Sequence, residues 1–124
     1  RWDGSRWSDS EITAAGGWFP STPEATTERE PHYSGGVVLD HDNPSVAYCS
    51  RPVGGIYEIE RFETPDGGGT WLSSPVTSGS SMNNIRPVVP RGHIPGGIEV
   101  LWMHGGYIHY TDYRTSIRFR RARR

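Results

Sequence analysis

The sequence predicts an all-β protein. Its 16 glycines and 10 prolines make up 26 of the 124 residues, about twice the usual share of ~12 %. Such frequent glycines and prolines leave no room for long helices. Between them lie short runs rich in β-branched and aromatic residues, which are typical of strands. The expected strands are 36–40, 45–50, 55–64, 70–77, 85–90, 98–103, 107–111 and 116–119.

The expected strands recur at a spacing of about 50 residues. The segment 36–39 corresponds to 86–89, and Tyr57 corresponds to Tyr107. A four-stranded antiparallel unit of this period is typical of a β-propeller blade, and closed propellers have ~4 to 8 blades. We therefore expect a partial β-propeller of about two four-stranded blades, the C-terminal part of a longer protein. The expected division is 1–31 as the end of a preceding blade with an interblade loop, 32–80 as a blade, 81–119 as the following blade and 120–124 as an arginine-rich tail.

One specific motif lies at residues 64–71, TPDGGGTW. It matches the Asp-box pattern Ser/Thr-x-Asp-x-Gly-x-Thr-Trp at every defined position. The aspartate can accept backbone N–H bonds within a tight loop, the glycines allow positive φ, and the tryptophan can pack the hairpin onto the blade. We expect a structural turn between the third and fourth strands. Its defining residues are Thr64, Asp66, Gly68, Thr70 and Trp71.

Six further strings lie between about Asp3 and Ile117. They are HYSGG at 32–36, LDHDNP at 39–44, YCSR at 48–51, YEIE at 57–60, NIRPVVP at 84–90 and LWMHGGY at 101–107. Together with the Asp box, they resemble the BNR-4 type of Asp-box (BNR repeat) propeller. The wider group contains carbohydrate-active proteins similar to ulvan lyases, to rhamnosidases and to sialidases.

The resemblance implies action on an acidic polysaccharide or oligosaccharide that contains uronic acids, by β-elimination or by exo-glycosidic cleavage. It also implies a secreted or periplasmic location and no cofactor. A non-catalytic propeller that binds glycans or another partner is the alternative, since the same residue types can bind a sugar without transferring protons.

The turns of an up-and-down blade alternate between the two faces of a propeller, so the candidate residues separate into two groups. The face opposite the Asp box combines arginines that can bind a carboxylate, groups that can move protons, and amides or rings suited to sugars. β-Elimination on a uronate needs a cation, a base for the C5 proton and an acid for the leaving oxygen. The predicted catalytic residues are Tyr33, Arg51, Arg86 and His32, and the predicted substrate-binding residues are Asn84, His104 and Trp18.

Structural roles for these residues remain open alternatives. His32 and Tyr33 can instead anchor the loop between blades, and Arg51 and Arg86, each next to a proline, can bind carbonyl groups between blades. His104 in a glycine-rich turn can simply be solvated. On the Asp-box face, a structural turn with no metal site is expected at Asp40, His41 and Asp42, with His93 nearby.

Charge and hydropathy argue against two classes of partner. The net charge is −1, and five of the last seven residues are arginines, which is typical of a solvated tail. We expect no nucleic-acid partner. No run approaches the ~18 apolar residues of a membrane span, and the single cysteine, Cys49, lies in an apolar run that predicts a buried thiol.

Overall fold

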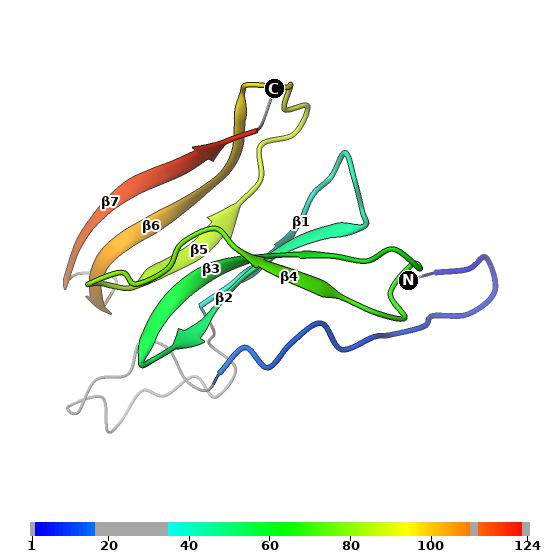
Figure 1. Cartoon of the computed structure of the whole chain (residues 1–124), viewed down its shortest axis with the longest axis horizontal. Helices are drawn as coiled ribbons and strands as arrows, with labels where there is room; N and C mark the ends of the chain where they lie inside the picture. The colour runs from blue at the N-terminus through cyan, green and yellow to red at the C-terminus, as the bar shows by residue number, and fades with distance from the viewer. Residues whose placement is uncertain (1, 17–34, 110–111, 123–124) are drawn as a thin grey trace.

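The computed structural model describes residues 2–16, 35–109 and 112–122, and these contain strands but no helix. The all-β prediction is confirmed. None of the described segments is a helix able to span a membrane. The strands, drawn in Figure 1, are β1 (Val37–Leu39), β2 (Val46–Val53), β3 (Ile56–Glu63), β4 (Leu72–Pro75), β5 (Asn84–Val88), β6 (Ile98–His109) and β7 (Asp112–Arg121).

The first sheet is an antiparallel meander in the order β1-β2-β3-β4. The turn between β2 and β3 consists of Gly54 and Gly55, with φ values of 60° and 87°. A two-residue hairpin turn with positive φ at both positions favours glycine, because a Cβ is unfavourable there. This turn sets the pairing of Val53 with Ile56 and the register of the whole hairpin.

The second sheet has three described strands, β5-β6-β7, where the sequence predicted a four-stranded blade. The expected turn at His104-Gly105-Gly106 is wrong, because β6 continues through it to His109. Gly105 has a φ of 135°, and a Cβ there would lie 2.2 Å from the backbone oxygen of Arg114 in β7. Glycine thus allows β6 and β7 to approach closely, and the strand expected at 98–103 continues through residues 107–109 of the next expected strand as one strand.

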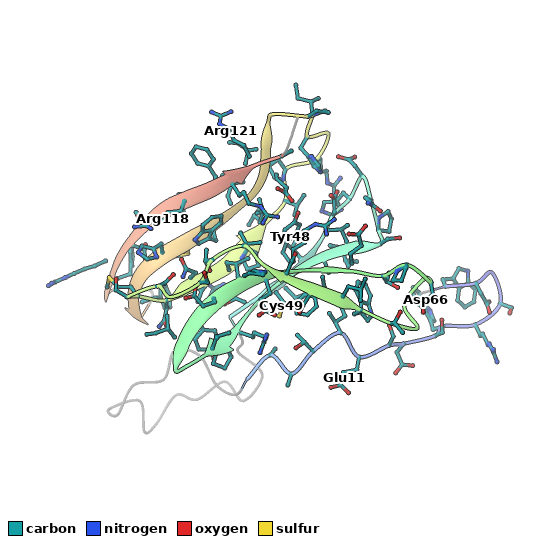
Figure 2. The ribbon with its side chains drawn as sticks, viewed as in Figure 1. Glu11, Tyr48, Cys49, Asp66, Arg118 and Arg121 are labelled. Atoms are coloured by element: carbon teal, nitrogen blue, oxygen red, sulfur yellow. The ribbon has the colours of Figure 1, made fainter. Side chains whose placement is uncertain are left out.

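The core lies where the second sheet packs against one face of the first. Val46, Tyr48 and Ile59 of the first sheet are at most 1 % exposed and form one cluster with Val89, Val100 and Trp102. Because side chains alternate along a strand, the next residues point the other way. Cys49, labelled beside Tyr48 in Figure 2, packs with Ala47 and Phe62 on the opposite face, as the buried-thiol prediction requires.

The N-terminal segment covers part of that opposite face, where Ile12 and Ala15 pack against the Cys49 cluster. At the other end of the chain, β7 extends through Arg121, so the tail expected from residue 120 begins as strand. Arg120 binds Glu99 of β6 through two nitrogens, at 2.8 and 2.9 Å. Figure 2 shows Arg118 and Arg121 along the same strand.

Candidate functional site

Asn84 is the centre of a buried polar network that joins the start of β5 to the first sheet. It is the first residue of β5 and 1 % exposed. Its Nδ2 donates to Glu58 Oε2 and to Ser80 Oγ, both at 3.0 Å. Its backbone oxygen accepts a hydrogen bond of 2.7 Å from Ser50 Oγ in β2. The predicted sugar-binding amide is therefore used to join β5 to the first sheet.

The other side of the Asn84 amide fixes the orientation of His104. Asn84 Oδ1 accepts from Trp102 Nε1 and pairs with His104 Nδ1, each at 2.9 Å. Because an amide oxygen only accepts, Nδ1 of His104 must hold the proton and Nε2 is the acceptor nitrogen of the neutral ring. Burial, with a smaller contribution from Arg118, lowers the pKa of His104. The neutral ring is therefore favoured.

Glu58 is 3 % exposed and supplies the negative charge of this network. Burial alone would raise the pKa of Glu58, but hydrogen bonds from Thr77, Ser80 and Asn84 outweigh it and hold the pKa below its usual value. Together with Glu60, Glu58 lines a hollow of 380 Å³ beside the turn between β2 and β3. Neither acid is among the site residues predicted from the sequence, although the alternation of Glu58 and Glu60 along one strand indicates that they share a face.

Arg86 has an unusual backbone conformation at the inner edge of the second sheet. Its φ is 54°, the only positive value among the described non-glycine residues. Its N–H donates to the oxygen of Gly35 at 2.6 Å, and its guanidinium lies 5.6 Å from the ring centre of Tyr107. A non-glycine residue at positive φ costs about 1–3 kcal/mol and is typical of functional sites.

Arg51 is not placed to act with Arg86. Arg51 Nε and Nη2 each lie 2.8 Å from the Glu60 carboxylate, so Arg51 forms a bidentate ion pair within the first sheet. By alternation along β2, Arg51 shares the face of Cys49, which is turned away from the second sheet. The described residues therefore show no clamp of two arginines around one carboxylate.

Three of the predicted site residues, His32, Tyr33 and Trp18, lie outside the described residues. Arg86, Asn84 and His104, in contrast, are all in the second sheet, on β5 and β6. Asn84 and His104 pair directly across these two strands.

The Asp-box segment forms a closed hydrogen-bonded loop. Asp66 Oδ1 accepts from the backbone N–H of Thr70 at 2.8 Å and from the hydroxyl of Thr64 at 3.0 Å, while Oδ2 accepts from the Thr70 hydroxyl at 2.9 Å. These bonds, led by the Thr70 backbone N–H, lower the pKa of Asp66 to about 2. Trp71 packs against the Cys49 cluster, so the loop is joined to the first sheet.

A second loop built on an aspartate lies near the N-terminus. Asp3 Oδ1 accepts the backbone N–H groups of Ser5 and Arg6, at 2.8 and 2.9 Å. Trp2 and Trp7 pair across this loop, with ring centres 5.6 Å apart. The Asp3 loop therefore resembles the Asp66 loop, because in both an aspartate carboxylate accepts backbone N–H groups and a tryptophan follows.

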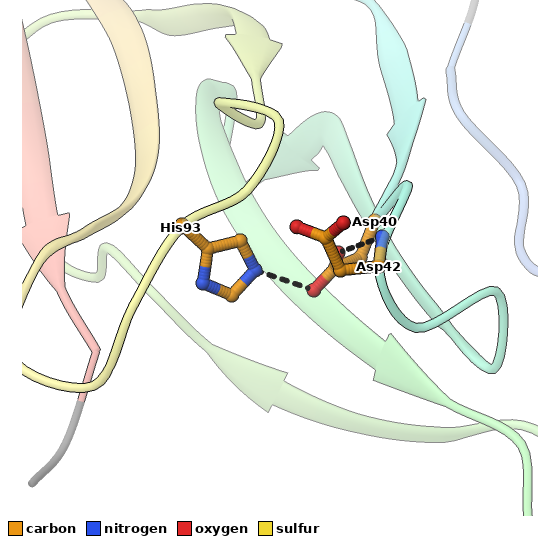
Figure 3. A group of neighbouring side chains, drawn as sticks. All are labelled: Asp40, Asp42 and His93. Atoms are coloured by element: carbon orange, nitrogen blue, oxygen red, sulfur yellow. Dashed lines mark hydrogen bonds and ion pairs between the residues drawn. The ribbon is translucent and has the colours of Figure 1, made fainter.

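At the Asp-box end of the sheets, the turn after β1 meets the loop before β6 (Figure 3). Asp40 is 6 % exposed, and its Oδ2 lies 3.0 Å from His93 Nε2. Its Oδ1 accepts the backbone N–H groups of Asp42 and Asn43, and Asp42 Oδ2 accepts that of Gly92 at 2.8 Å. Asp40, Asp42 and His93 therefore lie together, on two loops that are about 50 residues apart in sequence.

Comparison of the chain with protein-family models, with curated proteins and with solved structures finds no match in any of the three.

Proposed function

We propose that the chain is part of an Asp-box β-propeller of the BNR-4 type that acts on an acidic, uronic-acid-containing polysaccharide or oligosaccharide. β-Elimination is favoured over exo-glycosidic cleavage. The proposed location is secreted or periplasmic, where such polymers occur.

Two repeated features support the assignment to a propeller: antiparallel sheets that follow one another along the chain, and tight loops centred on an aspartate. A four-stranded antiparallel meander is followed by a second antiparallel sheet that packs on it. Asp3 and Asp66 each close a tight loop through backbone N–H bonds, and a tryptophan follows each loop. Repetition of one supersecondary unit along a chain is typical of propeller blades.

The observation that best supports the site is the backbone of Arg86. Its positive φ is held by the hydrogen bond to Gly35, and Gly36 is so close that a Cβ there would lie 3.2 Å from the Arg86 Cα. Gly35 directly follows the motif residues His32, Tyr33 and Ser34 in the sequence. Backbone strain that is maintained by close packing is typical of sites where a side chain is held in position for a ligand.

In the proposed reaction, Arg86 binds the uronate carboxylate. Its positive charge stabilises the negative charge that develops when the C5 proton leaves. Tyr33 is the proposed proton-transfer group, with His32 beside it in the sequence. His104 offers its Nε2 as an acceptor for a sugar hydroxyl, because Asn84 holds the proton on Nδ1. In the elimination, the electron pair of the broken C5–H bond forms the C4–C5 double bond, the C4–O bond breaks, and the leaving oxygen departs with the proton that Tyr33 transfers.

The test is binding and cleavage of uronic-acid polymers such as ulvan and polygalacturonate by the 124-residue chain. Binding is measured by affinity electrophoresis, and elimination by the ultraviolet absorbance of the unsaturated product. We expect Arg86→Ala to weaken binding at least tenfold, because the carboxylate loses its cation. Arg91→Ala is the matched control, since Arg91 is exposed at the opposite end of the second sheet. Equal binding by both variants would refute the assignment of Arg86.

The ion pair of Arg51 with Glu60 favours a second function, glycan binding without cleavage. Glu60 neutralises one of the two arginines expected to activate the substrate. The Tyr33→Phe variant separates the two functions. A lyase loses turnover and keeps its affinity, because the hydroxyl acts in the transition state. A binding protein forms no unsaturated product with either the wild type or the variant.

A further inference from the structure

We propose that Asp40, Asp42 and His93 bind a divalent transition-metal ion, with zinc the first candidate. The metal would tie the turn after β1 to the loop before β6. The site lies at the opposite end of β1 from Gly36, which contacts Arg86. Metal binding at this site is therefore independent of glycan binding around Arg86, and each can be tested without the other.

The spacing of His93 and Asp40 suits two ligands of one metal ion, and Asp42 lies close to both. Each of the three residues offers one ligand atom, and these atoms all lie within 4.8 Å of one another. Zinc binds histidine nitrogen and carboxylate oxygen at ~2.0–2.2 Å, so two ligands on one ion are separated by roughly 3–3.5 Å. His93 Nε2 and Asp40 Oδ2 are 3.0 Å apart. Small side-chain rotations would therefore bring Asp42 to the same ion.

Backbone groups hold the carboxylates in place. Two N–H groups, of Asp42 and Asn43, bind Asp40 Oδ1, and they leave Oδ2 directed at His93. The N–H of Gly92 binds Asp42 Oδ2 and so joins this carboxylate to the loop that contains His93. Outer hydrogen bonds of this kind orient metal ligands and reduce the reorganisation needed for binding.

The donor set selects the class of metal. One imidazole and two carboxylates suit zinc, manganese, iron or cobalt, whereas calcium and magnesium prefer oxygen ligands alone. Asp40 is buried and Asp42 is exposed, so the ion would reach the site from the solvent side. Three protein ligands leave the fourth position of a tetrahedral ion to water.

The simpler explanation is a hydrogen bond between Asp40 and His93 that only fastens the loops. In that case, the site gives a fixed structural contact and no metal affinity. The two explanations differ in what removal of the Nε2 ligand does to metal binding.

The test is titration of the chelator-treated full chain with zinc, followed by calorimetry and thermal unfolding, and with cobalt, followed by visible absorption. We expect binding near one ion per chain and a rise in melting temperature with zinc concentration, since a ligand of the folded state stabilises it. His93→Gln and Asp42→Asn should each weaken binding at least tenfold and remove the cobalt spectrum. His41→Ala is the matched control, because His41 is exposed in the same turn and lies outside the group.

Zinc binding that is unchanged in His93→Gln would overturn the proposal, as would the absence of binding by zinc, manganese or cobalt at millimolar concentration. Equal weakening by His41→Ala would also overturn it, because the metal would then bind an exposed histidine. Since His93→Gln can remove a stabilising contact even without metal, the variant's folding is checked separately by its melting temperature in chelator.

Discussion

The substitution Asn84→Asp places a second carboxylate in the buried network around Glu58. Asn84 Nδ2 now donates to Glu58 Oε2 at 3.0 Å. In the variant, the donor becomes an oxygen, and two acceptors of like charge face each other at nearly the same distance. Both residues are at most 3 % exposed. We therefore expect Asn84→Asp to destabilise the fold with almost no change in side-chain volume.

The size of the effect follows from the distance. Two like charges 3.0 Å apart repel by about 5 kcal/mol at an effective dielectric constant of ~20. The introduced carboxyl group can avoid part of this cost by binding a proton, so its pKa in the folded state rises above the unfolded value of ~3.9. We therefore expect a loss of about 2–4 kcal/mol at neutral pH, part of which is recovered on acidification.

The loss of stability in Asn84→Asp should depend on pH in one direction only. A group whose pKa is raised by folding binds its proton more readily in the folded state, so acidification favours folding until the pH falls below the unfolded pKa. The loss should therefore be larger at pH 7.5 than at pH 5.

The assay is urea unfolding followed by tryptophan fluorescence at the two pH values. Asn83→Asp is the matched control, because Asn83 uses its Oδ1 to accept the N–H of Tyr57 at 3.0 Å, and a carboxylate accepts this bond equally well. The control should change stability by less than ~0.5 kcal/mol. Equal stability of Asn84→Asp and wild type at pH 7.5, or a loss that is the same at both pH values, would refute the described network.

Two further predictions concern the strand pairing and the Asp box. Gly105→Ala should destabilise the fold strongly, because its Cβ would lie 2.2 Å from a backbone oxygen of β7, whereas Gly106→Ala, with 3.9 Å to its nearest neighbour, should be tolerated; equal melting temperatures would contradict the observed pairing of β6 with β7. Because folding lowers the pKa of Asp66 to about 2, its contribution to stability is present above pH ~4 and is lost as the pH falls towards 2. Asp66→Asn should lower the melting temperature at pH 7 and show a smaller acid-induced loss than wild type, and an unchanged acid profile would contradict this role.

Most of the first sheet could be predicted from the sequence, because its local signals agree. Runs of apolar and aromatic residues in β2 and β3 lie on both sides of the glycine pair 54–55, and the hairpin turn forms at this pair, although β2 continues to Val53, beyond the expected end at residue 50. The second sheet could not be predicted as well. In a sequence, Gly105 and Gly106 indicate a turn, but a glycine also permits close approach of two strands, and only the position of β7 decides between these roles.

The arrangement of the candidate site could also be predicted only in part from the sequence. Sequence analysis grouped Arg51 with Arg86 by the ends of their strands, but this grouping contains no information on which face each side chain occupies. Arg51 pairs with Glu60 because both lie on the same face of the first sheet. The positive φ of Arg86 and the hydrogen bonds of Asn84 depend on packing between segments distant in sequence, so no local pattern indicates them.

We propose above that the end of the molecule around Arg86 binds an acidic sugar. The most direct measurement is a titration of the isotope-labelled chain with a uronic-acid oligosaccharide, followed by the NMR shifts of its backbone amides. We expect saturable shifts at Gly35, Arg86, His104 and Tyr107, with little change in the loops around Asp42 and His93. No saturable shifts, or shifts confined to those loops or to the hollow beside Glu60, would contradict it.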